Sequence, residues 1–170
     1  MAMTHRITRP LLPFALSALA VCISGSAFAA GPDNAAPQSL SGDSILSRIC
    51  ARQFEIAQRT DMESFRDYDA ETFRAVHDDR AITVFDSGAT RIGIDAIMTA
   101  LASHFSGREA KWSWTERYRV VDGCSSAYIL YETTYEIPRI GYKQKALTGV
   151  TYSHNGLRWL AIADQGTKLP

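Results

Sequence analysis

Two aspartates occupy positions where a carboxylate can do chemistry. Asp61 lies on an otherwise apolar stripe with the spacing of a helix, and a carboxylate there must find partners or face a water-filled pocket. The rest of the stripe is Cys50, Phe54, Ala57, Phe65 and Tyr68. Asp86 follows the run AITVF, residues 81–85. Two carboxylates in one apolar pocket repel each other, which raises the pKa of one toward neutral pH, where it can exchange protons. Asp86 and Asp61 are therefore the candidate catalytic residues.

Each aspartate also has a purely structural explanation, and the sequence leaves both open. Asp61 can be a buried carboxylate bonded to an arginine or a tyrosine, because buried charges are usually paired. The tripeptide Asp86-Ser87-Gly88 is good turn chemistry, so Asp86 can serve the turn alone. Alternation along the strand places Ile82, Val84 and Asp86 on one face; if that face is the core face, Asp86 lies at its rim.

Aromatic residues supply the candidate ligand contacts. The simplest interpretation of these aromatic residues is that they belong to the core and the sheet. Those near the mouth of a pocket would also line a ligand site. The candidates are Trp112, Trp114, Tyr131, Tyr135 and Trp159, together with His104. His104 ends a predicted helix, where an imidazole can interact with the carbonyl dipole. For Asp164 the sequence suggests no more than a cap of the closing strand.

The first residues resemble a secretory signal. Basic residues precede an apolar run at residues 11–23, and Ala27-Phe28-Ala29 has the small-x-small pattern of a cleavage site. The run is shorter than the roughly 20 residues of a membrane span, which argues against an anchor. A cysteine at position 22 leaves lipidation as an alternative. We predict a signal peptide at 1–29, a flexible lead-in at 30–42, one domain at 43–170, and a secreted or periplasmic protein cleaved near Ala29.

Charge and cysteine content narrow the possible partners. The chain has 18 basic and 18 acidic residues in a mixed distribution. Such a distribution favours neither nucleic-acid binding nor attraction to an anionic membrane. We also predict no stable membrane insertion. Cys50 and Cys124 form an even pair in an exported domain, which favours a disulfide over two buried free thiols. Cysteines and histidines show no ligand spacing, so we predict no metal, and no cofactor.

Hydrophobic periodicity predicts an α+β domain. The pattern predicts a long helix after Asp43 and then a short helix capped by Asp69. A strand at 81–85 and a third helix over 94–105 follow. Four more strands follow, at 111–121, 127–137, 142–153 and 157–164. Asn155-Gly156 predicts an antiparallel hairpin between the last two.

The strand at 127–137 has two different faces. One face is suited to a core, and it carries Ile129, Tyr131, Thr133, Tyr135 and Ile137. The other face is mixed, and it carries Tyr128, Leu130, Glu132, Thr134 and Glu136. Helices can cover only one side of such a sheet, so we predict a homodimer through the other side.

Three stretches resemble the nuclear transport factor 2-like superfamily, in particular its SnoaL-like and ketosteroid-isomerase-like branches. They are YDAETFRAVHDDRAITVFD at 68–86, RIGIDAI at 91–97 and NGLRWLAIADQ at 155–165. The resemblance implies a cone-shaped fold, with three N-terminal helices packed in a strongly curved antiparallel sheet and a pocket at the open end. It also implies a homodimer through the outer sheet face.

The resemblance implies a base but not its partners. Asp86 falls at the position of the isomerase general base. The oxyanion-holding tyrosine falls near Asp61, and the second oxyanion acid near Gly149 or Val150, so neither is kept; this argues against steroid isomerisation. We predict an exported domain that binds a small, largely apolar, cyclic or aromatic molecule, with catalysis left open. The alternative is an isomerase, cyclase or hydrolase that uses Asp86 as general base with Asp61.

Overall fold

A computed structural model describes residues 45–170. The predicted signal peptide, the predicted lead-in and the predicted helix cap at Asp43 lie outside these residues. Within 45–170, no helix combines the length and the apolar character needed to cross a membrane.

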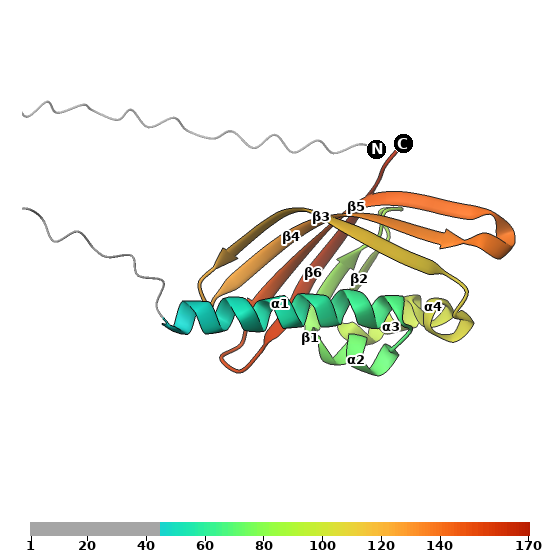
Figure 1. Ribbon diagram of the computed structural model, residues 1–170. Helices are drawn as coiled ribbons and strands as arrows, with labels where there is room; N and C mark the ends of the chain where they lie inside the picture. The colour runs from blue at the N-terminus through green and yellow to red at the C-terminus, as the bar shows by residue number, and fades with distance from the viewer. Residues whose placement is uncertain (1–44) are drawn as a thin grey trace, which may run out of the picture. The chain divides into compact units, whose positions relative to one another are not determined.

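Four α-helices and six strands make up the domain (Figure 1). The helices are α1 (Ile45–Arg66), α2 (Ala70–Ala75), α3 (Ile94–Ala100) and α4 (Ala102–Gly107). The strands are β1 (His77–Val84), β2 (Thr90–Ile92), β3 (Lys111–Asp122), β4 (Ser126–Ile137), β5 (Tyr142–His154) and β6 (Trp159–Lys168), with a short 3-10 helix, Pro138–Ile140, between β4 and β5. The predicted α+β class is confirmed.

The strands form one curled, unclosed sheet in the order β2-β1-β6-β5-β4-β3. Strands β3 to β6 are the predicted antiparallel meander, and the Asn155-Gly156 turn joins β5 to β6 as expected. Two features were not predicted: β1 pairs with β6 in parallel, and the short strand β2 pairs with the end of β1. The helices lie together on one side of the sheet, and Figure 1 shows α1 crossing beneath the long strands.

Helix α1 packs through the predicted stripe. Phe54 is fully buried, Cys50 and Asp61 nearly so, and the opposite side of the helix is exposed. Asp69 caps α2, as predicted, because its carboxylate accepts a hydrogen bond of 3.0 Å from the Thr72 N–H.

The predicted third helix is divided in two at Leu101. The Leu101 N–H still bonds the Ile97 carbonyl, but the His104 N–H bonds the Leu101 carbonyl three residues back, as in a 3-10 turn. No glycine or proline marks this point in the sequence. The change of direction at Leu101 begins α4, which carries His104 into a buried position.

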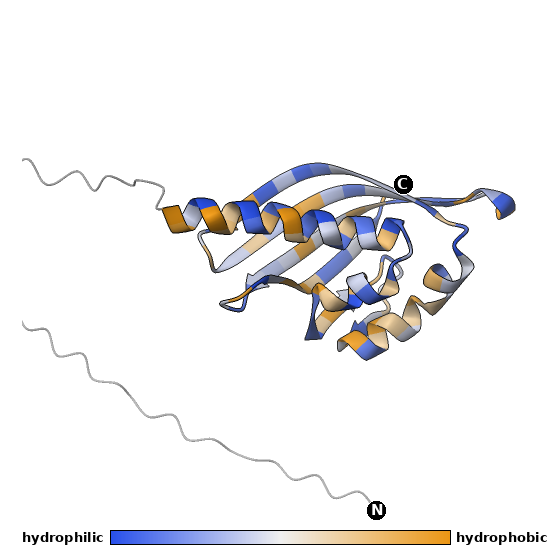
Figure 2. Cartoon of the chain, turned by 60° about the horizontal axis from the view of Figure 1, so that its bottom comes forward, coloured by the Kyte–Doolittle hydropathy of each residue, from blue (hydrophilic) through white to orange (hydrophobic). Residues whose placement is uncertain are grey.

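Buried residues form two clusters. The larger lies between α1 and the long strands and includes Phe54, Ile129, Tyr131, Tyr152 and Trp159. The smaller joins α2, β1 and α3: Phe73, Ala81, Ile94 and Ile97. On β4, Ile129, Tyr131 and Thr133 are buried, which confirms the predicted core face. Hydrophobic and hydrophilic residues alternate along the long strands in Figure 2.

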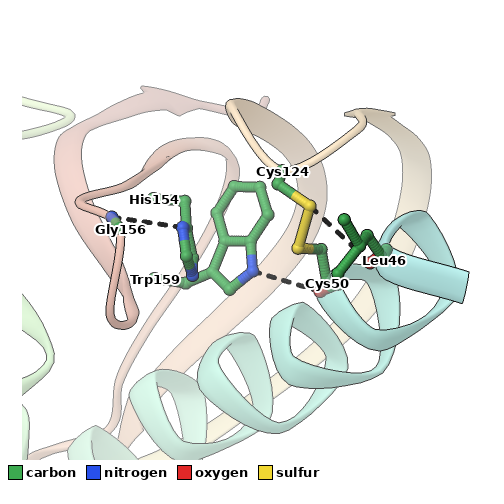
Figure 3. Close-up of a disulfide and its surroundings, with 6 residues drawn as sticks. All are labelled: Leu46, Cys50, Cys124, His154, Gly156 and Trp159. Carbon is green, nitrogen blue, oxygen red and sulfur yellow. Dashed lines mark hydrogen bonds between the residues drawn. A yellow bond between two sulfur atoms is a disulfide. The ribbon is translucent and has the colours of Figure 1, made fainter.

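The predicted disulfide joins Cys50 of α1 to Cys124 in the turn between β3 and β4, across 74 positions of the sequence. Figure 3 shows Trp159 beside it, with the indole Nε1 donating a hydrogen bond of 3.1 Å to the Cys50 carbonyl. The disulfide therefore ties the start of α1 to the end of the sheet that holds this tryptophan.

Candidate functional site

A cavity of about 330 Å³ opens between the helices and the inner face of the sheet. Its walls come from α1, α2, β1, α3, α4 and all four long strands, so it is assembled from the whole domain. Most of the lining is apolar or aromatic. The polar residues of the lining include Asp61, Thr83, Asp86, His104, Gln144 and Asp164.

Asp61 is buried at 4% exposure and is held by a tyrosine. The Tyr152 hydroxyl donates a hydrogen bond of 2.6 Å to Asp61 Oδ2, and His77 Nε2 lies 3.8 Å from Asp61 Oδ1. Burial raises the pKa of Asp61, while His77 and the Tyr152 hydrogen bond oppose that rise. Burial and the nearby Asp61 charge raise the pKa of Tyr152 well above its usual value, so it remains a donor. The tyrosine partner is the structural alternative anticipated for Asp61.

Asp164 is the second carboxylate near Asp61, and it was not predicted as a site residue. It lies on the central strand β6, in register with Thr83 of β1 and Val150 of β5. Directly opposed residues share a face, and both neighbours are buried on the inner face. Burial and the negative charge of Asp61 raise the pKa of Asp164 to about 7.

Asp86 combines the turn and the cavity. It is the second residue of the β1–β2 turn, in which the Gly88 N–H bonds the Phe85 carbonyl at 2.8 Å and Gly88 has φ +83°. Its carboxylate also lines the cavity and accepts a hydrogen bond from the Gln144 side-chain amide. Gly166 of β6 allows the close approach, because a Cβ there would lie 3.2 Å from the Asp86 nitrogen.

The strand alternation is not what brings Asp86 to the cavity. In the second half of β1 the buried positions are Ala81 and Thr83, whereas Ile82 and Val84 are half-buried. Strand β1 ends at Val84, so alternation does not extend to Asp86. The turn directs the side chain instead.

His104 forms a neutral pair with Tyr135 in the cavity wall. His104 Nε2 lies 2.7 Å from the Phe65 carbonyl, which can only accept, so this nitrogen carries the proton. His104 Nδ1 then accepts from the Tyr135 hydroxyl at 3.1 Å. The ring stacks on Phe65, with centroids 3.8 Å apart, and burial lowers the pKa of His104.

The sequence-predicted residues divide into two groups. Five line the cavity: Asp61, Asp86, His104, Trp112 and Tyr135. Three lie outside its walls, because they are engaged elsewhere. Trp159 packs beside the disulfide, the Tyr131 hydroxyl donates to Gln58 Oε1 at 2.7 Å, and Trp114 lies under the Arg66 guanidinium at 5.6 Å.

Sequence reasoning missed Asp164, Tyr152 and Gln144. A charged residue in the closing strand WLAIADQ was the one available signal for Asp164. Its inward direction depends on register with β1, a strand far away in the sequence. Within residues 45–170, no group of three or more His, Cys, Asp or Glu side chains is arranged to hold a metal ion.

Comparison with known proteins supports the fold. No protein-family model matches the chain, and no curated protein sequence matches it. Solved structures do match. An NTF-2 like protein of unknown function from Shewanella oneidensis has a TM-score of 0.59 at 11% identity, over 69% of this chain and 98% of that one.

Two further structures agree. A protein with a cystatin-like fold from Caulobacter vibrioides has a TM-score of 0.59 at 14% identity, over 72% of this chain and 91% of its own. A ketosteroid isomerase-like protein from Erwinia carotovora has a TM-score of 0.58 at 12% identity, over 70% and 95%. The domain therefore has the nuclear transport factor 2-like fold, as the sequence predicted.

Proposed function

We propose that the domain binds a small, largely apolar molecule in this cavity. The observation that carries the proposal is the cavity itself: about 330 Å³, apolar walls and a few convergent polar groups. Small-molecule sites have this size and this composition.

The aromatic walls favour a cyclic or aromatic ligand. Phe65 and Trp112 lie edge to face with centroids 5.1 Å apart, and Tyr135 lies 6.4 Å from Phe65 and 6.3 Å from Trp112. Aromatic rings that pack against one another at these distances present flat, apolar surfaces to a ligand in the cavity. The His104–Tyr135 pair fixes two of these side chains in place.

Ligand retention tests the proposal. The protein is purified from its native host and extracted, and the extract is analysed by mass spectrometry. Ala100→Trp introduces a large side chain into the cavity wall, whereas Ala102→Trp makes the same change at an exposed position outside it. We expect the wild type and Ala102→Trp to release one small molecule that Ala100→Trp lacks. An empty wild-type extract, or equal retention by both variants, would contradict the proposal.

An acid–base enzyme is the second candidate. It is favoured by three carboxyl groups in one cavity, Asp61, Asp86 and Asp164, one of which has a pKa of about 7. In this case Asp86 is the general base and Asp61 its partner. Incubation of the retained molecule with wild type should then give a new product, and Asp86→Asn should keep binding but lose turnover. An unchanged molecule would leave binding as the function.

We extend the proposal to a homodimer through the outer sheet face. Tyr128, Leu130 and Leu147 border a hollow of about 320 Å³ there, above Gly149. Tyr118 and Val120 on β3 are exposed at 56% and 47%. Apolar area of this kind usually marks an interface.

Light scattering decides the oligomeric state. We expect the mass of a dimer for wild type and of a monomer for Leu130→Glu on the outer face. Ile92→Glu, at an exposed isoleucine of the edge strand β2, serves as the matched control and should remain dimeric. A monomeric wild type would end this part of the proposal.

Export completes the proposal. The disulfide between Cys50 and Cys124 is the supporting observation, since such bonds persist in oxidising compartments. Amino-terminal sequencing of the protein from its host should find a chain that begins near Ala30, outside the cytoplasm. An intact first residue would contradict cleavage.

A further inference from the structure

One end of the cavity offers hydrogen-bond acceptors without matching donors. Among residues 45–170, no side chain or backbone donor bonds the Asp164 carboxylate or the Thr83 hydroxyl, although Thr83 is only 4% exposed. Asp61 uses Oδ2 for Tyr152, and its Oδ1 has only His77 nearby, at 3.8 Å. Thr83 is buried and Asp164 is half-buried, and both line the cavity, so a molecule that enters it can supply the donors.

These acceptors lie side by side. Thr83 and Asp164 are register partners on neighbouring strands β1 and β6. Asp61 lines the same cavity from α1, and its charge raises the pKa of Asp164. One small group can therefore face all three.

Basic side chains are scarce around these carboxylates. The residues that line the cavity include no lysine and no arginine. His104 has both ring nitrogens engaged and its pKa is lowered, so it remains neutral. His77 Nδ1 donates to the Phe73 carbonyl at 2.7 Å, which leaves Nε2 to face Asp61 Oδ1 at 3.8 Å. Among the described residues, no basic side chain forms an ion pair with Asp164. The cavity is thus an apolar space with a negative end.

We propose that the ligand of this cavity carries a protonated amine, which pairs with the carboxylates of Asp61 and Asp164 beside the Thr83 hydroxyl while its apolar part lies among the aromatic walls. The inference rests on the proposed binding function and narrows its ligand class. A nitrogen cation supplies several N–H donors and the missing positive charge at once, which a neutral hydroxyl does not. A ligand with a carboxylate would be repelled.

Three probes with one ring system test this class: naphthylmethylamine, naphthylmethanol and naphthoic acid. Binding to the full exported chain is followed by isothermal titration calorimetry near neutral pH. We expect the amine to bind about tenfold more tightly than the alcohol, the usual gain of a charge-assisted hydrogen bond, and the acid most weakly. Amine binding should also release protons, because a cation lowers the pKa of a neighbouring carboxyl group. Titrations in two buffers of different ionisation enthalpy measure that release.

Matched variants locate the interaction. Asp164→Asn should reduce the preference for the amine over the alcohol to less than about threefold, whereas Asp122→Asn, at an exposed carboxylate on the end of β3, should leave it unchanged. If Asp164→Asn does not fold, proton release by the wild type decides. An alcohol that binds as well as the amine, without proton release, would overturn the amine class and leave the binding function intact. Failure of all three probes would overturn both.

Discussion

Replacement of Asp164 by asparagine should change the stability of the domain relative to wild type by an amount that grows in the variant's favour as the pH rises. The ordinary pKa of the carboxyl group is 3.8, whereas burial and Asp61 raise it to about 7 in the folded domain. The folded state therefore binds the proton more tightly than the unfolded state. Unfolding between these pKa values releases a proton, so the contribution of Asp164 to stability is most favourable near pH 4 and decreases as the pH rises toward 7.

The magnitude follows from the two pKa values. The two pKa values differ by about 3, and a difference of one pKa unit corresponds to about 1.4 kcal/mol. The upper limit of the stability difference above pH 7 is therefore about 4 kcal/mol. Water that enters the cavity reduces the effect, so we expect about 2 to 4 kcal/mol. The asparagine amide has its own cost of burial, but that cost is the same at every pH. It cancels when the variant is compared with wild type at two pH values.

Urea unfolding of the oxidised protein measures this difference. The free energy of unfolding is determined for wild type and Asp164→Asn near pH 4 and near pH 8, with Asp122→Asn as the control for the same change at an exposed site. We expect the variant to gain on wild type by about 2 to 4 kcal/mol between the two conditions, and the control to gain nothing. A difference that does not change with pH would refute an ionised Asp164 held beside Asp61 in the cavity wall.

Two further predictions concern other contacts. Removal of the disulfide by Cys50→Ser with Cys124→Ser should lower the free energy of unfolding by about 4 kcal/mol, since the bond closes a loop across 74 positions; urea unfolding with and without reductant checks this, and equal stability of variant and oxidised wild type would contradict it. Tyr135→Phe removes the donor to His104 Nδ1 and should cost about 1 kcal/mol, measured the same way, whereas an unchanged midpoint would mean that the hydrogen bond contributes nothing.

Local patterns predicted most of the fold. The apolar stripe of α1, the Asp69 cap, the Asn155-Gly156 turn and the inner face of β4 are written in residues close together in the sequence. These local patterns are also consistent with one another, and such consistency allows a fold to be predicted from a single sequence. The division between α3 and α4 was missed because Leu101 is an ordinary helix former.

The candidate site was harder to predict because it depends on register between distant strands. Asp61 was found since it interrupts a local pattern. Asp164 was not, because its direction is set by parallel pairing with β1 and by a register shift at Thr151 and Tyr152, where Ile162 of β6 is left without a partner on β5. A bulge changes which residues point inward, and no short sequence signal announces it.

The position of β6 determines when the domain can be completed. This strand lies between β1 and β5, so it is the only link between the β2-β1 pair and the β5-β4-β3 ribbon in the described sheet. While residues 159–168 are still inside the ribosome, the β2-β1 pair and the β5-β4-β3 ribbon can each form. They cannot join, because β1 pairs with β6 across most of the domain sequence. Asp164 and Gly166 belong to β6 and line the cavity, so this part of the cavity wall forms only when β6 is in place. The cavity is therefore the last part of the domain to form during synthesis.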